Sequence, residues 1–217
     1  MENKKIILFQ GDSITDAYRA GVDIRNMGCG YPTLVSGEIG FDYPGQYEFY
    51  NRGVGGNRIV DIYARIKMDI LSLKPDILSI LVGVNDVWHE IMLQNGIDAD
   101  KYFKIYCMLI EEIKEALPDT KIMILEPFVL RASATEERWD EFWAEMVIIA
   151  QKAREVAEKY DLLFIPLQGK FDEAAKLAPN EYWLFDGVHP MAAGYELIKR
   201  AWMEGFCKLV GGRKLSD

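Results

Sequence analysis

The sequence is poor in several residue types on which whole classes of function depend. Its 217 residues include only two histidines, and the 25 basic residues are outnumbered by 34 acidic ones. The formal net charge is −9 and the pI is about 4.9. A nucleic-acid-binding protein would present a basic face, so this composition argues against one. No apolar run approaches the roughly 20 residues of a membrane-spanning helix.

The sequence is also short of metal and disulfide signals. Cys29, Cys107 and Cys207 are odd in number and far apart, so they predict neither a disulfide framework nor a ligand set. Two histidines a hundred residues apart do not make a zinc site. The opening "MENKKIILFQGDS" has too short an apolar run for a signal peptide and lacks a cleavage site. We therefore expect a cytoplasmic protein with reduced thiols and with no metal, membrane or nucleic-acid partner.

Short apolar runs alternate with longer amphipathic segments. The runs are continuous rather than alternating, which is typical of strands buried on both faces of a parallel sheet; they cover residues 5–10, 47–51, 76–83, 121–127 and 162–166. The amphipathic segments predict helices over residues 57–74, 100–117, 135–160 and 191–210. This alternation predicts a single three-layer α/β/α domain over residues 1–210. We expect residues 211–217 to form a loose tail.

Polar and glycine-rich blocks follow the predicted strands. The order along the chain is "GDSITD" (11–16), "NRGVGGN" (51–57), "GVNDVW" (83–88) and "FDGVHP" (185–190). Each block alone has a plain structural explanation: a helix N-cap, a tight turn, an Asx-turn and a capped turn. In an open parallel sheet, however, the carboxyl ends of the strands gather at one site.

Together these blocks supply the parts of an acyl-transfer site. Ser13 is a candidate nucleophile, and the glycines and Asn85 can donate N–H groups to a developing oxyanion. Asp186 and His189 are three residues apart, so one turn can place the carboxylate beside the imidazole of a general base. Asp86 and His89 repeat the same step, so spacing alone leaves two candidate bases.

The four ordered blocks resemble those of the SGNH (GDSL) hydrolase family, and the resemblance covers the whole chain. It implies a flavodoxin-like fold with a five-stranded parallel sheet and an ester hydrolase that needs no cofactor. It further implies the triad Ser13, Asp186 and His189, and an oxyanion hole of the Ser13 and Gly56 N–H groups with the Asn85 side chain. The family block favours His189 over His89, which we expect at the pocket rim or the surface.

Within this family the sequence is most similar to bacterial acetylxylan esterases, through "GCGY" (28–31) and "LKPDILSILVGVNDVW" as well as the four blocks. This implies a cytoplasmic, homo-oligomeric enzyme that removes acetyl groups from xylo-oligosaccharides. Two departures affect substrate specificity: Phe185 stands where such relatives can carry tryptophan, and residues 130–142 match no family block.

Several side chains near the blocks are candidates for substrate contact, although core packing or surface solvation explains each of them as well; they are Asp12, Tyr31, Arg58, Trp88, Trp183 and Phe185. Trp139 and Trp143 share a helix face, which indicates core or a subunit contact. Three other readings remain open: a lipase or thioesterase of the same family, a non-catalytic carbohydrate-binding protein, and a Mg²⁺-dependent phosphoesterase.

Overall fold

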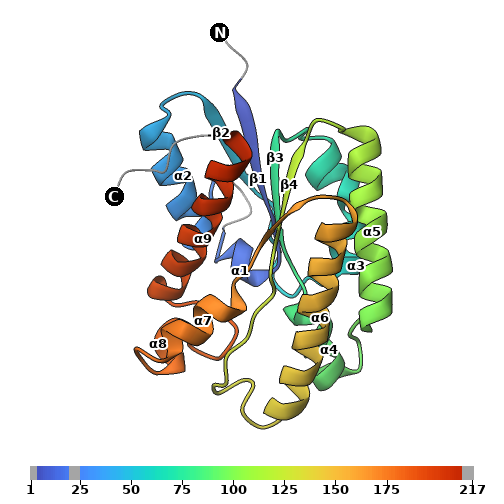
Figure 1. Cartoon of the computed structure of the whole chain (residues 1–217), viewed down its shortest axis with the longest axis vertical. Helices are drawn as coiled ribbons and strands as arrows, with labels where there is room; N and C mark the ends of the chain where they lie inside the picture. Colours follow the sequence, from blue (N-terminus) through green and yellow to red (C-terminus); the bar gives the residue numbers. More distant parts are fainter. Residues whose placement is uncertain (1–3, 20–24, 212–217) are drawn as a thin grey trace.

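A computed structural model describes residues 4–19 and 25–211, in which helices cover both faces of one five-stranded sheet (Figure 1). The strands are β1 (Lys5–Gly11), β2 (Tyr47–Asn51), β3 (Ile77–Leu81), β4 (Lys121–Leu125) and β5 (Leu163–Ile165). All neighbours pair in parallel, in the order β2-β1-β3-β4-β5. The predicted three-layer, flavodoxin-like fold is therefore confirmed. Apart from Gly211, the predicted tail lies outside the described residues.

Burial on both faces explains why the strands read as continuous apolar runs. Every residue of β3 is buried, and Ile7, Leu8 and Phe9 of β1 have no exposed surface. Removing a side chain of this size from water stabilises the fold by about 1.5–3 kcal/mol. Because neither face of the central strands β1, β3 and β4 meets solvent along most of its length, these strands show no alternation of polar and apolar residues.

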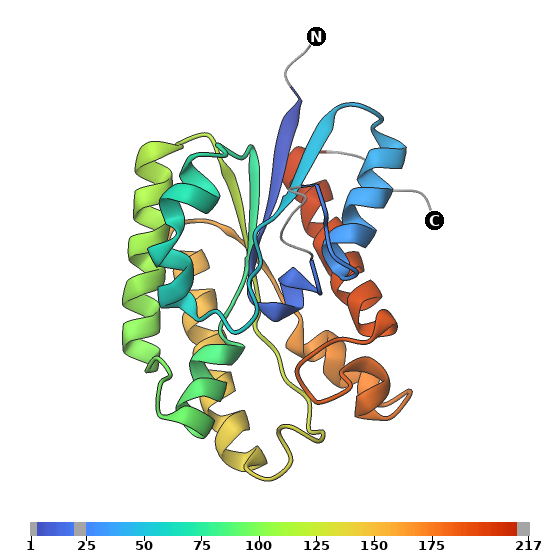
Figure 2. The same cartoon turned by 180° about the vertical axis from the view of Figure 1, so that it is seen from behind.

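The helices form two layers, which Figures 1 and 2 show from opposite sides. Helices α2 (Tyr31–Asp42) and α9 (Ala192–Val210) cover one face, while α3 (Ile59–Ala64), α5 (Ala99–Ala116) and α6 (Trp139–Lys159) cover the other. Trp202 of α9 packs on Phe9 of β1 with ring centroids 5.3 Å apart. Four further helices are α1 (Ser13–Asp16), α4 (Val84–Leu93), α7 (Gln168–Ala175) and α8 (Asn180–Trp183).

The helix predictions are wrong in two places. The single helix expected over residues 57–74 divides into α3 and a π-helical turn, η1 (Lys67–Leu71). At this break the buried carboxylate of Asp69 pairs with Arg65 and lies 4.0 Å from Arg52, a tertiary interaction that no helical periodicity reveals. The helix expected from residue 135 begins at Trp139, because the N–H groups of Thr135 and Glu136 both donate to the Ala132 carbonyl in a turn before it.

The strand order places a crevice where function is expected. The chain leaves β1 towards β2 on one side, and β3 lies on the other side, so the carboxyl ends of β1 and β3 flank the point where the winding reverses. Helix α1 begins after β1 and α4 begins after β3. Among the described residues, no helix combines the length and the apolar character that crossing a membrane requires.

Candidate active site

The turn after β1 presents Ser13 at the start of α1. The side-chain Oδ1 of Asp12 accepts a hydrogen bond from the Ile14 N–H at 2.9 Å and so caps this one-turn helix. A methyl group on Gly11 would lie 2.4 Å from both the Leu81 carbonyl oxygen and the Thr15 Oγ1, so only glycine lets β1 end this close to β3. Ser13 itself is half-buried.

Ser13, His189 and Asp186 form a hydrogen-bonded chain. The Ser13 Oγ lies 2.8 Å from His189 Nε2, and His189 Nδ1 lies 2.7 Å from Asp186 Oδ2. The other carboxylate oxygen of Asp186 accepts from the backbone N–H groups of Val188 and His189, at 2.9 and 2.8 Å. One short turn therefore carries both the candidate base, His189, and the carboxylate that is hydrogen-bonded to it.

The surroundings of this pair adjust both pKa values in the direction that a base and its partner need. Burial opposes ionisation of the Asp186 carboxyl, but hydrogen bonds from His189 and the backbone outweigh it, so the pKa of Asp186 lies below its usual value. The hydrogen bond to Asp186 raises the pKa of His189 above 6.5, against the effect of burial. An ionised Asp186 carboxylate in this position favours the protonated form of the His189 imidazole.

The loop that carries this pair is closed at its base. Leu184 and Pro190 form an isolated antiparallel bridge, and the Phe185 N–H donates to the His189 carbonyl at 3.0 Å. Gly187 lies at the tip with a φ of +97°, which favours glycine. Pro190 precedes α9, so the loop is held between the bridge and the start of a long helix.

The glycine block and Asn85 reach the same end of the sheet. A methyl group on Gly55 would lie 3.8 Å from the Ser13 Cβ, so this turn runs beside the nucleophile. Gly56 has a φ of +78°. Asn85 lies in the first turn of α4 and gives one Nδ2 proton to the Asn57 carbonyl at 3.2 Å, which leaves a second proton for an oxyanion.

Sequence reasoning missed the residue that joins the nucleophile turn to the glycine block. The buried Asn51 side chain donates to the Thr15 carbonyl at 2.6 Å and accepts from the Gly53 N–H at 2.9 Å. Its position at the end of a predicted strand, directly before Arg-Gly, was the available signal in the sequence. Asn51 thereby fixes the position of the glycine block relative to α1.

In the second Asp-x-x-His pair, Asp86 and His89, the carboxylate is hydrogen-bonded to the backbone rather than to the imidazole. Both oxygens of the buried Asp86 carboxylate accept from the Ile59 N–H, at 3.1 and 3.3 Å, so Asp86 caps the start of α3. His89 lies over the glycine turn, 3.9 Å from where a Gly56 methyl group would be. Burial and the nearby Arg58 lower the pKa of His89. The expected location of His89 at the rim of the site agrees with this position.

Two of the predicted aromatic contacts flank His189, the candidate base. The Phe185 ring stacks on His189 with centroids 5.7 Å apart and planes at 23°, and 46% of Phe185 is exposed. Trp88 lies against the same imidazole at 5.9 Å. Trp183, in α8, is half-buried next to this loop.

The expectation that Tyr31 and Asp12 contact substrate is wrong, because neither side chain has a surface to offer. Tyr31 is fully buried and its hydroxyl lies 3.1 Å from Thr15 Oγ1. Asp12 is 1% exposed, and its Oδ2 has no hydrogen-bond partner among the residues that the structure describes. Desolvation by this burial raises the pKa of Asp12 to about 7, although the Ile14 N–H and the nearby His189 act against it.

The predicted arginine contact is already engaged within the protein. The Arg58 guanidinium pairs with Asp61 at 2.9 Å and donates to the carbonyl and side-chain oxygens of Asn95, at 2.6 and 3.1 Å. These bonds tie the start of α3 to the segment after α4. Arg58 thus braces the wall of the site on the side where His89 lies.

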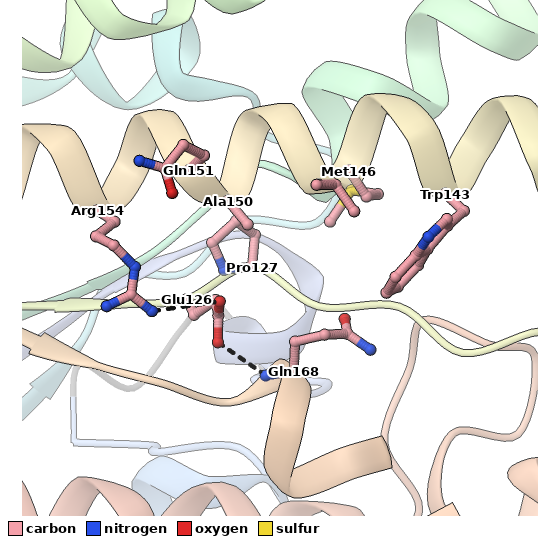
Figure 3. A pocket seen from close by; sticks show the side chains of 9 residues that line it. Glu126, Pro127, Trp143, Met146, Ala150, Gln151, Arg154 and Gln168 are labelled. Atoms are coloured by element: carbon pink, nitrogen blue, oxygen red, sulfur yellow. Dashed lines mark hydrogen bonds and ion pairs between the residues drawn. The ribbon is translucent and has the colours of Figure 1, made fainter.

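Trp139 and Trp143 belong to a different part of the surface. The two indoles stack on α6 with centroids 5.6 Å apart. Trp143 also lines a pocket of about 290 Å³ between α6 and the start of α7, with Arg154 at its opposite end and Glu126 between (Figure 3). The Glu126 carboxylate accepts from the Leu167 and Gln168 N–H groups, so it caps α7. The lining of this pocket includes none of the predicted site residues.

Comparison with known proteins agrees with this geometry. A model of the GDSL-like lipase/acylhydrolase family matches residues 9–197. An acetylxylan esterase of Geobacillus stearothermophilus is 30% identical over 206 residues, which cover 91% of each chain.

Solved structures extend the likeness to the fold. The crystal structure of Axe2, an acetylxylan esterase from Geobacillus stearothermophilus, superposes with a TM-score of 0.82 at 29% identity and covers 94% of this chain and 96% of that chain. A candidate GDSL-like lipase from Parabacteroides merdae gives a TM-score of 0.89 at 37% identity over 94% and 97%. This chain therefore belongs to the GDSL-like lipase/acylhydrolase family and is a carboxylic ester hydrolase.

Proposed function

We propose that this protein is a serine esterase that removes acetyl groups from sugar hydroxyls, with xylo-oligosaccharides as the leading substrate class. The observation that carries the proposal is the chain from Ser13 through His189 to Asp186, with links of 2.8 and 2.7 Å, at the reversal point of the sheet. A hydroxyl, an imidazole and a carboxylate in this order are the parts of a general-base-activated nucleophile.

In the first half of the reaction, His189 Nε2 takes the proton of Ser13 as Oγ attacks the ester carbonyl carbon. The imidazolium is stabilised by Asp186, which stays ionised because its pKa is lowered. His189 then gives the proton to the departing sugar oxygen, and the acetyl group remains on Ser13. In the second half, His189 takes a proton from a water molecule as the water oxygen attacks the acetyl carbon. The bond from that carbon to Ser13 Oγ then breaks, His189 returns the proton to Oγ, and acetate leaves.

Negative charge develops on the carbonyl oxygen during both attacks. The Ser13 and Gly56 N–H groups and the second Nδ2 proton of Asn85 are the proposed donors to it. Loss of one such preorganised donor costs about 10²–10³ in rate in comparable sites. The positive φ of Gly56 and the bond from Asn85 to Asn57 hold two of these donors before substrate arrives.

The two rings beside His189 are the proposed contacts for the sugar. Phe185 and Trp88 offer apolar faces on which a pyranose ring can lie while its acetylated oxygen points to Ser13. The named relatives support this substrate class, since Axe2 is described as an acetyl-xylooligosaccharide esterase. Its catalytic mutants, at 28% identity to this chain, replace a serine, an aspartate and a histidine with alanine.

The direct test measures acetate release from acetylated xylo-oligosaccharides and from p-nitrophenyl acetate. We expect the wild type to turn over both and Ser13→Ala to reduce the rate to near that of the uncatalysed reaction, because no nucleophile remains. A wild type no faster than Ser13→Ala would refute the proposed mechanism. Preference for p-nitrophenyl esters of C8 or longer would keep the mechanism and overturn the acetyl specificity.

The two histidines provide a matched pair within the same assay. His189→Ala should abolish turnover, whereas His89→Ala should retain kcat on p-nitrophenyl acetate, since His89 lies beyond the glycine turn and its Asp86 neighbour caps α3. If the two variants behaved in the opposite way, the assignment of the base would be reversed.

A further inference from the structure

A segment that matches no family block lies directly against the loop of the catalytic pair. The Leu130 N–H donates to the Gly187 carbonyl at 2.8 Å, and the Ala134 N–H donates to the Asp186 carbonyl at 3.0 Å. We call residues 130–136 the supporting segment. The segment lies in the connection between β4 and α6, and it contacts the Asp186 loop there.

The supporting segment and the Asp186 loop are packed so closely that no room is left for a side chain at Gly187. A methyl group on Gly187 would lie 2.4 Å from the Leu130 carbonyl oxygen and 2.8 Å from the Thr135 Oγ1. The loop can approach this closely only with glycine at its tip, in the left-handed conformation that Gly187 adopts. A displacement of the segment would therefore be transmitted to the backbone between Asp186 and His189.

Thr135 fixes the shape of the supporting segment from within. Its hydroxyl accepts from the Ala132 N–H at 3.0 Å and donates to the Leu130 carbonyl at 2.8 Å. The side chain is 1% exposed, so water cannot replace either bond. Leu130 is also the residue that donates to Gly187, which places the Thr135 hydroxyl one hydrogen bond away from the catalytic loop.

The outer side of the segment is anchored as well. The Arg131 guanidinium pairs with Glu136 at 2.8 and 2.9 Å, and the Asn180 side chain of α8 donates to the Arg131 carbonyl at 2.8 Å. Exposed ion pairs of this kind contribute little on their own. The buried threonine is thus the main internal tie of the segment.

We propose that Thr135 is a positioning residue for the Asp186–His189 pair, acting through the supporting segment and the carbonyls of Asp186 and Gly187. The proposal rests on the proposed function, since it gives the segment a role in holding a catalytic dyad. It predicts that the Thr135 hydroxyl matters for turnover although it touches no reacting atom.

The test compares three variants of the full chain. Thr135→Val keeps the shape of the side chain and removes both hydrogen bonds, while Thr135→Ser keeps the hydroxyl. Thr120→Val is the matched control: the Thr120 hydroxyl also donates to a backbone carbonyl, that of Pro75, at 2.6 Å, but at the amino end of β4. Each protein is assayed with p-nitrophenyl acetate, and the downfield proton resonance of His189 Nδ1–H is recorded by NMR.

We expect Thr135→Val to lower kcat about tenfold to a hundredfold with little change in KM, because small misplacement of a catalytic group has effects of this size. Its His189 resonance should broaden or shift, and Thr135→Ser should restore both readouts. Thr120→Val should leave both unchanged even if it lowers stability.

Two outcomes would count against different claims. If Thr135→Val matched the wild type in kcat and in the His189 resonance, the positioning role would be refuted while the esterase remained. If Thr120→Val lowered kcat as much as Thr135→Val, the effect would be general destabilisation. A wild type no faster than Ser13→Ala would instead remove the proposed function itself.

Discussion

Asp12 lies one residue before Ser13, the proposed nucleophile, and is an ionisable group that the proposed reaction does not use. One oxygen caps α1, whereas the other is buried without a partner, and a buried carboxylate in that condition favours its neutral form. Charged and titratable groups surround it from several elements; those that interact with it are His189, Asp86, Tyr31, Tyr102 and Tyr195. Its role is to hold the nucleophile turn in place.

This position makes stability depend on pH in a defined direction. A carboxyl whose pKa rises from 3.8 to about 7 on folding binds its proton more tightly in the native state, so it stabilises the fold at low pH. That contribution is lost as the pH rises from about 4 to 7. Asp12→Asn keeps a capping oxygen and cannot ionise.

Relative to the wild type, Asp12→Asn should therefore gain on the order of 2–3 kcal/mol of unfolding free energy between pH 5 and pH 8. Urea titrations of both proteins at the two pH values measure this. Asp119→Asn, at an exposed position, controls for the loss of one negative charge. A difference between Asp12→Asn and wild type that stays constant with pH would contradict the expectation.

At the scale of elements, the start of α9 meets the end of α8 at a glycine. A methyl group on Gly194 would lie 2.3 Å from the backbone carbonyl oxygen of Trp183, which also accepts from the Met191 N–H at 2.9 Å. These contacts hold the base of the loop that carries Asp186 and His189. Helix propensity alone favours alanine at a helical glycine, so tertiary packing decides this position.

Gly194→Ala should accordingly destabilise the protein by about 1–3 kcal/mol, since the backbone of Trp183 must move. Gly37→Ala, in α2, is the matched control: it is exposed and has no neighbour within 4 Å of the added methyl group. It should raise stability by up to about 1 kcal/mol. Thermal or urea unfolding compares the two, and equal effects of the same sign would refute the packing argument.

At the scale of the whole molecule, the sheet order gathers segments that lie far apart along the chain. Ser13 follows β1, Asn85 follows β3, and His189 comes 176 residues after Ser13, yet two of them share a hydrogen bond. Within residues 4–19 and 25–211, no three His, Cys, Asp or Glu side chains cluster in a way that would hold a metal ion.

The proposed mechanism predicts that esterase activity survives removal of metal ions. Dialysis against a chelator should leave kcat/KM on p-nitrophenyl acetate unchanged, because the proposed base and oxyanion donors all belong to the chain. Loss of activity that Mg²⁺ restores would favour the metal-dependent phosphoesterase reading of the acidic strand ends.

The sequence by itself determined the fold class and the order of the chemical groups. Continuous apolar runs predicted the five strands to within two residues at each end. They did so because a strand in the interior of a parallel sheet needs apolar side chains on both faces. The four polar blocks predicted Ser13, Asp186 and His189, since the carboxyl ends of parallel strands meet at one edge.

Only the tertiary structure decided which hydrogen-bond partners and how much burial each residue receives from neighbouring elements. Asp86 and Asp186 precede a histidine by the same three residues, but one caps α3 and the other bonds the imidazole, because their turns face different partners. Tyr31 is buried rather than exposed at the rim of the site. The supporting segment is hydrogen-bonded to the Asp186 loop, and no sequence motif predicted this contact. Local patterns record burial and turn chemistry, whereas contacts between distant segments depend on how the layers pack.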